Sequence, residues 1–166
     1  KKNELSLNRF IFTLRDFGNS DLLLAQNLST DYIKISPQKN ILYPHAIETL
    51  DYLKGRYELH IITNGFVEVQ YNKLKNAGLD KYFNNTITSE EAGAQKPNLQ
   101  IFEYSLKKAN ALASESLMIG DDLQADIIGA KNAGIDQVYF NIEKTPHNEN
   151  ITHEIDSLIK IIDILN

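Results

Sequence analysis

The residues best suited to chemistry lie in the stretch LMIGDDLQAD, at positions 117–126. A short apolar run ends at Gly120, the carboxylates of Asp121 and Asp122 follow, and Asp126 comes one helical turn later. Such a run is typical of a buried strand, and in open α/β sheets ligands bind beyond the carboxyl ends of the strands. Carboxylates this close repel one another unless a cation lies between them, and Mg²⁺ prefers oxygen ligands. The stretch therefore predicts a magnesium site; the alternative is an acidic cap and first turn of the next helix.

Two earlier groups in the chain can bind an anion. Thr63, Asn64 and Gly65 follow the apolar run YELHII, so a hydroxyl, backbone N–H groups and a helix N-terminus meet there. Asn-Gly is also a common turn dipeptide, and a turn alone is the other interpretation. Lys96 precedes Pro97, where a helix cannot continue, and lysine is a point-charge partner for phosphate. A hydroxyl, an ammonium and a magnesium site together indicate phosphoryl transfer.

The elements that must position these groups follow from the spacing of the apolar residues. Residues 1–36 predict two helices separated by Gly18-Asn19-Ser20, with no strand between them. From residue 40 on, helices and strands alternate, which predicts a parallel sheet with helices on both faces. The predicted helices are 44–54, 66–77, 98–110, 122–133 and 154–165, and the predicted strands are 57–62, 86–88, 117–120 and 137–141, with a loop over 90–95.

Composition limits the class of protein. A chain of 166 residues with 42% hydrophobic and 23% charged residues is ordinary for a globular domain with a small appendage. A net charge of −5 argues against a nucleic-acid or anionic-membrane partner. Cysteine is absent, no apolar run approaches membrane-spanning length and no signal peptide opens the chain, so we expect a cytoplasmic protein. The first residue is Lys1, so we expect either a processed start or a piece of a longer protein.

Three segments carry a family resemblance. HIITNGF, AQKPNLQIF and MIGDDLQADIIGAKNAG, in this order, resemble motifs II, III and IV of the haloacid dehalogenase (HAD) superfamily. The variants TNGF and KPNxxIF are most similar to the small phosphatases that include bacterial pyrimidine 5′-nucleotidases. The resemblance covers about residues 40–166 and implies an α/β fold, with a Rossmann-like three-layer core and a parallel sheet. It also implies that residues 1–39 are the remnant of a helical cap.

The resemblance assigns roles to the candidate residues. Thr63 and Lys96 would be catalytic, and Thr63, Asn64, Gly65 and Lys96 would bind the phosphate. Mg²⁺ would be held by Asp121 directly, with Asp126 supporting it through water or neighbouring groups. Asp122 is either a third metal residue or only a helix cap.

The chain departs from the family pattern at its start. HAD enzymes attack phosphate with the first Asp of a D-x-D motif on the first strand, and this chain has no D-x-D. Asp16, Asp21 and Asp31 stand in helical or turn contexts instead. We therefore expect the nucleophile, the general acid and one metal ligand upstream of Lys1, and an inactive chain by itself. The absent strand belongs between strands 57–62 and 117–120, which we expect not to pair with each other.

The predicted function is a Mg²⁺-dependent phosphate monoester hydrolase that acts through an aspartyl-phosphate, with a 5′-nucleotide as the first candidate substrate. Its expected partner is a small phosphorylated metabolite rather than a nucleic-acid polymer or a membrane. Two alternatives stay open: an inactive HAD-fold binding module and a HAD dehalogenase. A phosphoacceptor receiver domain is disfavoured, because there the acidic pair comes first and the lysine last, whereas here Thr63 and Lys96 precede Asp121.

Overall fold

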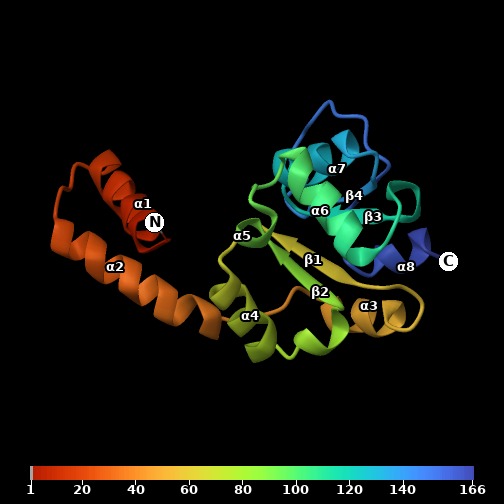
Figure 1. Ribbon diagram of the computed structural model, residues 1–166, viewed down its shortest axis with the longest axis horizontal. Helices are drawn as coiled ribbons and strands as arrows, with labels where there is room; N and C mark the ends of the chain where they lie inside the picture. The colour runs from red at the N-terminus through yellow and green to blue at the C-terminus, as the bar shows by residue number, and fades with distance from the viewer. Residues whose placement is uncertain (1) are drawn as a thin grey trace. The chain divides into compact units, whose positions relative to one another are not determined.

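The computed structural model describes residues 2–166, without the side chains of Lys2, Asn3 and Leu5. The chain divides into two compact units, Lys1–Asn40 and Ile41–Asn166 (Figure 1). None of the described helices combines the length and the apolar character that crossing a membrane requires.

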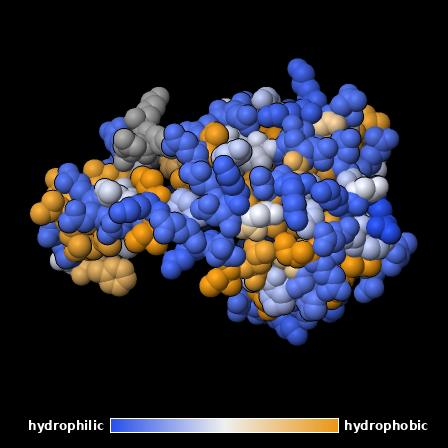
Figure 2. Space-filling view, turned by 90° about the horizontal axis from the view of Figure 1, so that it is seen from below, coloured by the Kyte–Doolittle hydropathy of each residue, from blue (hydrophilic) through white to orange (hydrophobic). Residues whose placement is uncertain are grey.

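The first unit consists of the two predicted helices. They are α1 (Lys2–Asp16) and α2 (Leu22–Ile35), and a short 3₁₀ turn, η1 (Ser36–Gln38), follows. The helices pack together, with the buried hydroxyls of Ser6 and Ser29 at 2.9 Å. Large apolar side chains nevertheless stay exposed on this unit, and Figure 2 shows hydrophobic surface on it. Phe17 is 83% exposed and Leu23 is 66% exposed. Two helices alone therefore do not bury the apolar surface that they carry.

The second unit alternates helices and strands, as predicted. Its elements are α3 (Ala46–Leu53), β1 (His60–Thr63), α4 (Val67–Asn76), η2 (Asp80–Tyr82), β2 (Asn85–Thr88), α5 (Ser89–Ala92), α6 (Leu99–Ala109), η3 (Ala113–Glu115), β3 (Leu117–Gly120), the π-helix η4 (Leu123–Ile128), α7 (Gly129–Asn132), β4 (Asp136–Phe140), β5 (His153–Ile155) and α8 (Lys160–Ile164). The strands form two parallel sheets, with orders β1-β2 and β3-β4-β5. The α/β fold with a parallel sheet is confirmed.

Helices cover both faces of the two sheets. On one face, Phe102 of α6 is fully buried in a cluster to which Ile62 of β1 and Met118 of β3 contribute. On the other face, Leu53 of α3 and Ile161 of α8 belong to a second cluster with residues of β4 and β5. Met118 of β3 belongs to the first cluster, and Leu117 and Ile119 of β3 belong to the second, so this strand lies in the middle of three layers.

The two sheets do not join through β1 and β3. Among the described residues, β1 pairs only with β2 and β3 only with β4, as predicted. Every residue of β1 and β3 is half-buried, whereas β2 and β4, their outer neighbours, contain fully buried residues such as Ile87 and Val138. The inner strands of a parallel sheet are normally the most buried, and here that order is reversed.

Three segments differ most from the prediction. The strand predicted over 57–62 begins only at His60 and ends at Thr63. The expected loop over 90–95 begins inside a helical turn, α5, which a capping box stabilises. The Thr88 N–H donates to the Glu91 carboxylate at 3.2 Å, and the Glu91 N–H donates to the Thr88 hydroxyl oxygen at 3.3 Å. The predicted helix over 154–165 was wrong at its start. Residues His153–Ile155 pair with β4 as a third strand, and only Lys160–Ile164 are helical. Burial of Ile155 against β4 outweighs the local helical spacing there.

Candidate active site

The turn after β1 presents a hydroxyl. Thr63 is the last residue of β1, and its side-chain oxygen accepts a hydrogen bond from the Gly65 N–H at 3.0 Å. The Thr63 hydroxyl proton makes no hydrogen bond among the described residues and is available to a ligand oxygen. The first N–H of α4, on Val67, donates to Glu90 at 3.1 Å, so this carboxylate already occupies part of the helix N-terminus. The contact between Val67 and Glu90 could not be predicted from the sequence, because Glu90 lies in a stretch predicted as a loop.

Asn64 joins this turn to the segment that carries Lys96. Its side-chain oxygen accepts from the Lys96 N–H at 2.7 Å, and its side-chain nitrogen donates to the Lys96 carbonyl at 3.1 Å. Both ends of the amide are therefore engaged by one residue. Asn64 consequently positions Lys96. The second hydrogen of its side-chain NH₂ makes no hydrogen bond among the described residues, and its role in phosphate binding stays a prediction.

Lys96 is the centre of the site. Its ammonium donates to the carbonyl oxygen of Ile62 at 2.9 Å and to Oδ1 of Asp126 at 2.5 Å. The side chains are only 12% and 7% exposed, so this ion pair lies largely away from water. An ammonium has three N–H groups, so one remains for a ligand. The Ile62 carbonyl had no sequence signature, because a backbone acceptor is present at every residue.

Asp126 reaches this position because Gly120 has no side chain. A Cβ at Gly120 would overlap the Asp126 side chain, so the carboxylate lies directly against the end of β3. The second oxygen of Asp126 accepts from the Asp122 N–H at 3.3 Å. Asp126 is thus engaged by Lys96 and by backbone, which agrees with a supporting role rather than a direct ligand role.

Asp122 caps the following helix. Its carboxylate accepts from the N–H groups of Gln124 and Ala125 at 3.0 and 2.8 Å. The helix begins with a π turn, in which Ile127 N–H bonds to the Asp122 carbonyl at 3.2 Å. Such wide turns are frequent at functional sites. Both hydrogen bonds of the Asp122 carboxylate are capping bonds, so its contacts favour the helix cap over a metal ligand.

Asp121 differs from its two neighbours. It is exposed at the tip of β3, and its carboxylate has no hydrogen bond or ion pair among the described residues. No group of three or more acidic or histidine residues in the described part of the chain converges on a metal position. Mg²⁺ needs only one or two protein carboxylates, since water and substrate supply other ligands. The Asp121 carboxylate, which has no other partner among the described residues, has the chemistry of one such ligand.

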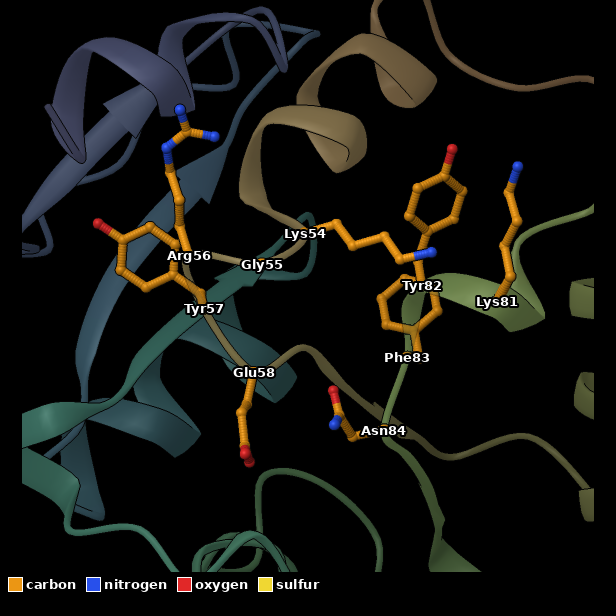
Figure 3. A pocket seen from close by; sticks show the side chains of 9 residues that line it. All are labelled: Lys54, Gly55, Arg56, Tyr57, Glu58, Lys81, Tyr82, Phe83 and Asn84. Carbon is orange, nitrogen blue, oxygen red and sulfur yellow. The ribbon is translucent and has the colours of Figure 1, made fainter.

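The predicted groups therefore lie together at the carboxyl ends of β1 and β3. Hydrogen bonds connect the turn at Thr63, through Asn64 and Lys96, to Asp126 and Asp122. A separate cavity of about 460 Å³ lies at the opposite edge, lined by residues 54–58 and 81–84. There Lys54 extends toward Tyr82, and Arg56 and Tyr57 point the other way (Figure 3). None of the predicted site residues lines that cavity.

Comparison with known proteins agrees with this geometry. A family model described as haloacid dehalogenase-like hydrolase matches residues 11–140. The chain belongs to this family. Its HAD relatives include the HAD-hydrolase YfnB of Bacillus subtilis, 32% identical over 99% of this chain and 71% of that protein. A crystal structure of YfnB bound to magnesium superposes with a TM-score of 0.89 at 30% identity, over 99% of this chain and 72% of that one.

The relatives that carry names of phosphatases include two pyrimidine 5′-nucleotidases. The pyrimidine 5′-nucleotidase PynA of Streptococcus pneumoniae is 35% identical over 99% of this chain and 70% of its own length. The pyrimidine 5′-nucleotidase YjjG of Escherichia coli is 37% identical over 70% of this chain and 56% of its own length. The chain thus spans just over half of YjjG and about seven-tenths of YfnB and PynA.

Proposed function

We propose that this chain supplies most of the α/β core of a Mg²⁺-dependent hydrolase of phosphate monoesters. The observation that carries the proposal is the Lys96 ammonium, held between the Ile62 carbonyl and Asp126 beside the Thr63 hydroxyl. One N–H of Lys96 and the Thr63 hydroxyl proton are free, and two donors of this kind suit the oxygens of a phosphoryl group. PynA and YjjG favour a 5′-nucleotide as the first substrate to test.

The residues of this chain bind and orient rather than attack. Lys96 neutralises negative charge on the phosphoryl group, and Asp126 and Asn64 keep its ammonium in place. Thr63 holds a second oxygen. Asp121 is the residue that would hold Mg²⁺, which when bound supplies charge neutralisation for the phosphate and its attacking group.

The nucleophile in this proposal lies outside the chain, on a strand between β1 and β3. Three facts support it: the sequence has no D-x-D, β1 and β3 do not pair, and both are less buried than their outer neighbours. Unpaired backbone groups in a core are costly, so an inserted strand would stabilise both edges. An aspartate at its carboxyl end would lie beside Lys96 and Asp121 and form the aspartyl-phosphate.

The inserted strand predicts a change in hydrogen exchange. In this chain alone, we expect fast exchange at those amides of β1 and β3 that face away from β2 and β4. In a longer protein that contains the strand, the same amides should be protected. Mass spectrometry or NMR measures the exchange, and β4, which is paired on both sides, serves as the internal control. Equal protection of β1 and β3 in both proteins would contradict the proposal.

The exposed apolar surface of the first unit supports a related assignment. We propose that α1 and α2 belong to a larger helical cap, whose remaining helices would cover side chains such as Phe17 and Leu23. The cytoplasmic location stays a prediction from composition.

A phosphate-release screen of the full-length protein tests the function. We expect Mg²⁺-dependent release from pyrimidine 5′-monophosphates and no release when EDTA replaces Mg²⁺. Chloride release from a 2-chloro acid without metal would instead favour the dehalogenase. We disfavour that alternative because the exposed carboxylate of Asp121 is suited to bind a cation, which a dehalogenase does not need. A protein that binds phosphate but turns over no ester would be the inactive binding module.

A further inference from the structure

The helix that follows the Thr63 turn receives its cap from a distant part of the chain. α4 begins after Phe66, whose apolar side chain makes no capping hydrogen bond. A helix normally receives such a bond from the residue that precedes it. Here Glu90, the second residue of α5, accepts from the Val67 N–H at 3.1 Å instead. The start of α4 is therefore tied to α5 across 23 positions of the sequence.

The segment from Ser89 to Lys96 holds the same turn at further points. The Ser89 hydroxyl donates to the Asn64 carbonyl at 3.4 Å. The Asn64 side chain makes its two hydrogen bonds with the Lys96 backbone. Glu90 holds the other end of the turn, at Val67. The segment that carries Lys96 therefore fixes both ends of the turn that follows β1.

Glu90 has no other structural task among its contacts. The capping box of α5 is formed by Thr88 and Glu91, and Lys108 pairs with Glu91 at 3.2 Å. Glu90 is exposed, and its carboxylate accepts one hydrogen bond among the described residues, from Val67. A negative charge near a turn that binds phosphate repels the phosphate, so a benefit of the contact must outweigh that repulsion.

We propose that Glu90 is a positioning residue of the phosphate-binding turn. By fixing the Val67 N–H, it keeps the turn in the conformation in which the Thr63 hydroxyl and the Lys96 ammonium serve one phosphoryl group. Displacement of a binding group by about 1 Å can slow a reaction about 100-fold, whereas solvent and salt weaken the repulsion from an exposed charge. The tether is thus worth more than the repulsion costs. This inference rests on the proposed function.

Two variants separate the tether from the charge. Glu90→Gln removes the charge but keeps a side-chain oxygen that can accept from the Val67 N–H, and Glu90→Ala removes both. We expect Glu90→Ala to raise the Kd for inorganic phosphate at least about tenfold, because the turn loses its fixed position. Glu90→Gln should keep the wild-type Kd. An effect of the charge alone has the opposite sign, since both variants would then bind phosphate more tightly.

The test is the binding of inorganic phosphate to the full-length protein with Mg²⁺ present, measured by calorimetry well below the unfolding temperature of each variant. Hydrogen exchange at the Val67 amide, followed by NMR, reports the tether itself. It should become faster in Glu90→Ala and stay unchanged in Glu90→Gln. Glu103→Ala is the matched control, because it removes an exposed glutamate of α6 whose carboxylate has no hydrogen bond or ion pair among the described residues. We expect it to bind phosphate normally.

Three results would overturn the inference. An unchanged phosphate Kd in Glu90→Ala, whatever the exchange rate at Val67, would remove Glu90 from the site and leave the proposed function standing. Tighter binding in both Glu90 variants, or equally weaker binding in both, would show that the charge matters and the hydrogen bond does not. A wild-type protein that binds no phosphate would refute the proposed function and this inference with it.

Discussion

Replacement of Lys96 by alanine is expected to lower turnover of the full-length protein at least about 100-fold and the free energy of unfolding by about 3–5 kcal/mol. The ammonium is the partner of a buried carboxylate, Asp126, and of the Ile62 carbonyl. Removing it leaves the Asp126 charge uncompensated where only 7% of its side chain meets water. Phosphate release measures the first effect, and urea unfolding measures the second.

A double variant separates the chemical from the structural loss. Lys96→Met with Asp126→Asn removes both charges at nearly constant volume, and Asn still accepts from the Asp122 N–H. We expect stability to return close to the wild type, because a buried pair replaced by neutral residues costs little. Turnover should stay as low as in Lys96→Ala. Normal turnover in either variant would exclude Lys96 from phosphate binding.

Replacement of Asp121 by alanine is expected to abolish Mg²⁺-dependent turnover while leaving the fold intact. Metal stabilisation of a transition state is worth several kcal/mol, so the loss should be at least about 1,000-fold. The carboxylate is exposed and has no partner among the described residues, so the free energy of unfolding should change by less than about 0.5 kcal/mol. Lys96 and Asp121 therefore differ in kind, since only the first is expected to change stability.

The control for Asp121 is Asp163→Ala, which removes an exposed carboxylate from α8 at the other end of the unit's sequence. It should leave both turnover and stability unchanged. Turnover retained by Asp121→Ala at saturating Mg²⁺ would show that the metal, if used, is held by other residues. The assignment of Asp121 would then fail even if the protein proved to be a phosphatase.

Much of the fold follows from local pattern. The apolar run Leu117–Gly120 is a strand with the predicted bounds, because a short run closed by Gly and followed by acids has few other solutions. The helix that starts after Pro97 is also where spacing predicts it, with Asn98 as its cap. Residues 153–155 were predicted as part of a helix but form a strand. The apolar side chain of Ile155 fits either element, and pairing with β4 decides between them.

The chemistry of the site divides in the same way. Sequence determined which groups this chain offers, namely a hydroxyl at Thr63, an ammonium at Lys96 and carboxylates after Gly120, because residue type and strand-end position are local properties. Only the tertiary structure decided what each one does. In the structure, Asp126 pairs with the Lys96 ammonium, Asp122 caps the helix and Asn64 hydrogen-bonds to the Lys96 backbone. Asp121 has no such partner among the described residues. The Asp122 cap is a local contact with residues two and three positions on, but the assignments of Asp126 and Asn64 depend on distances between residues about thirty positions apart, which spacing along a chain cannot encode.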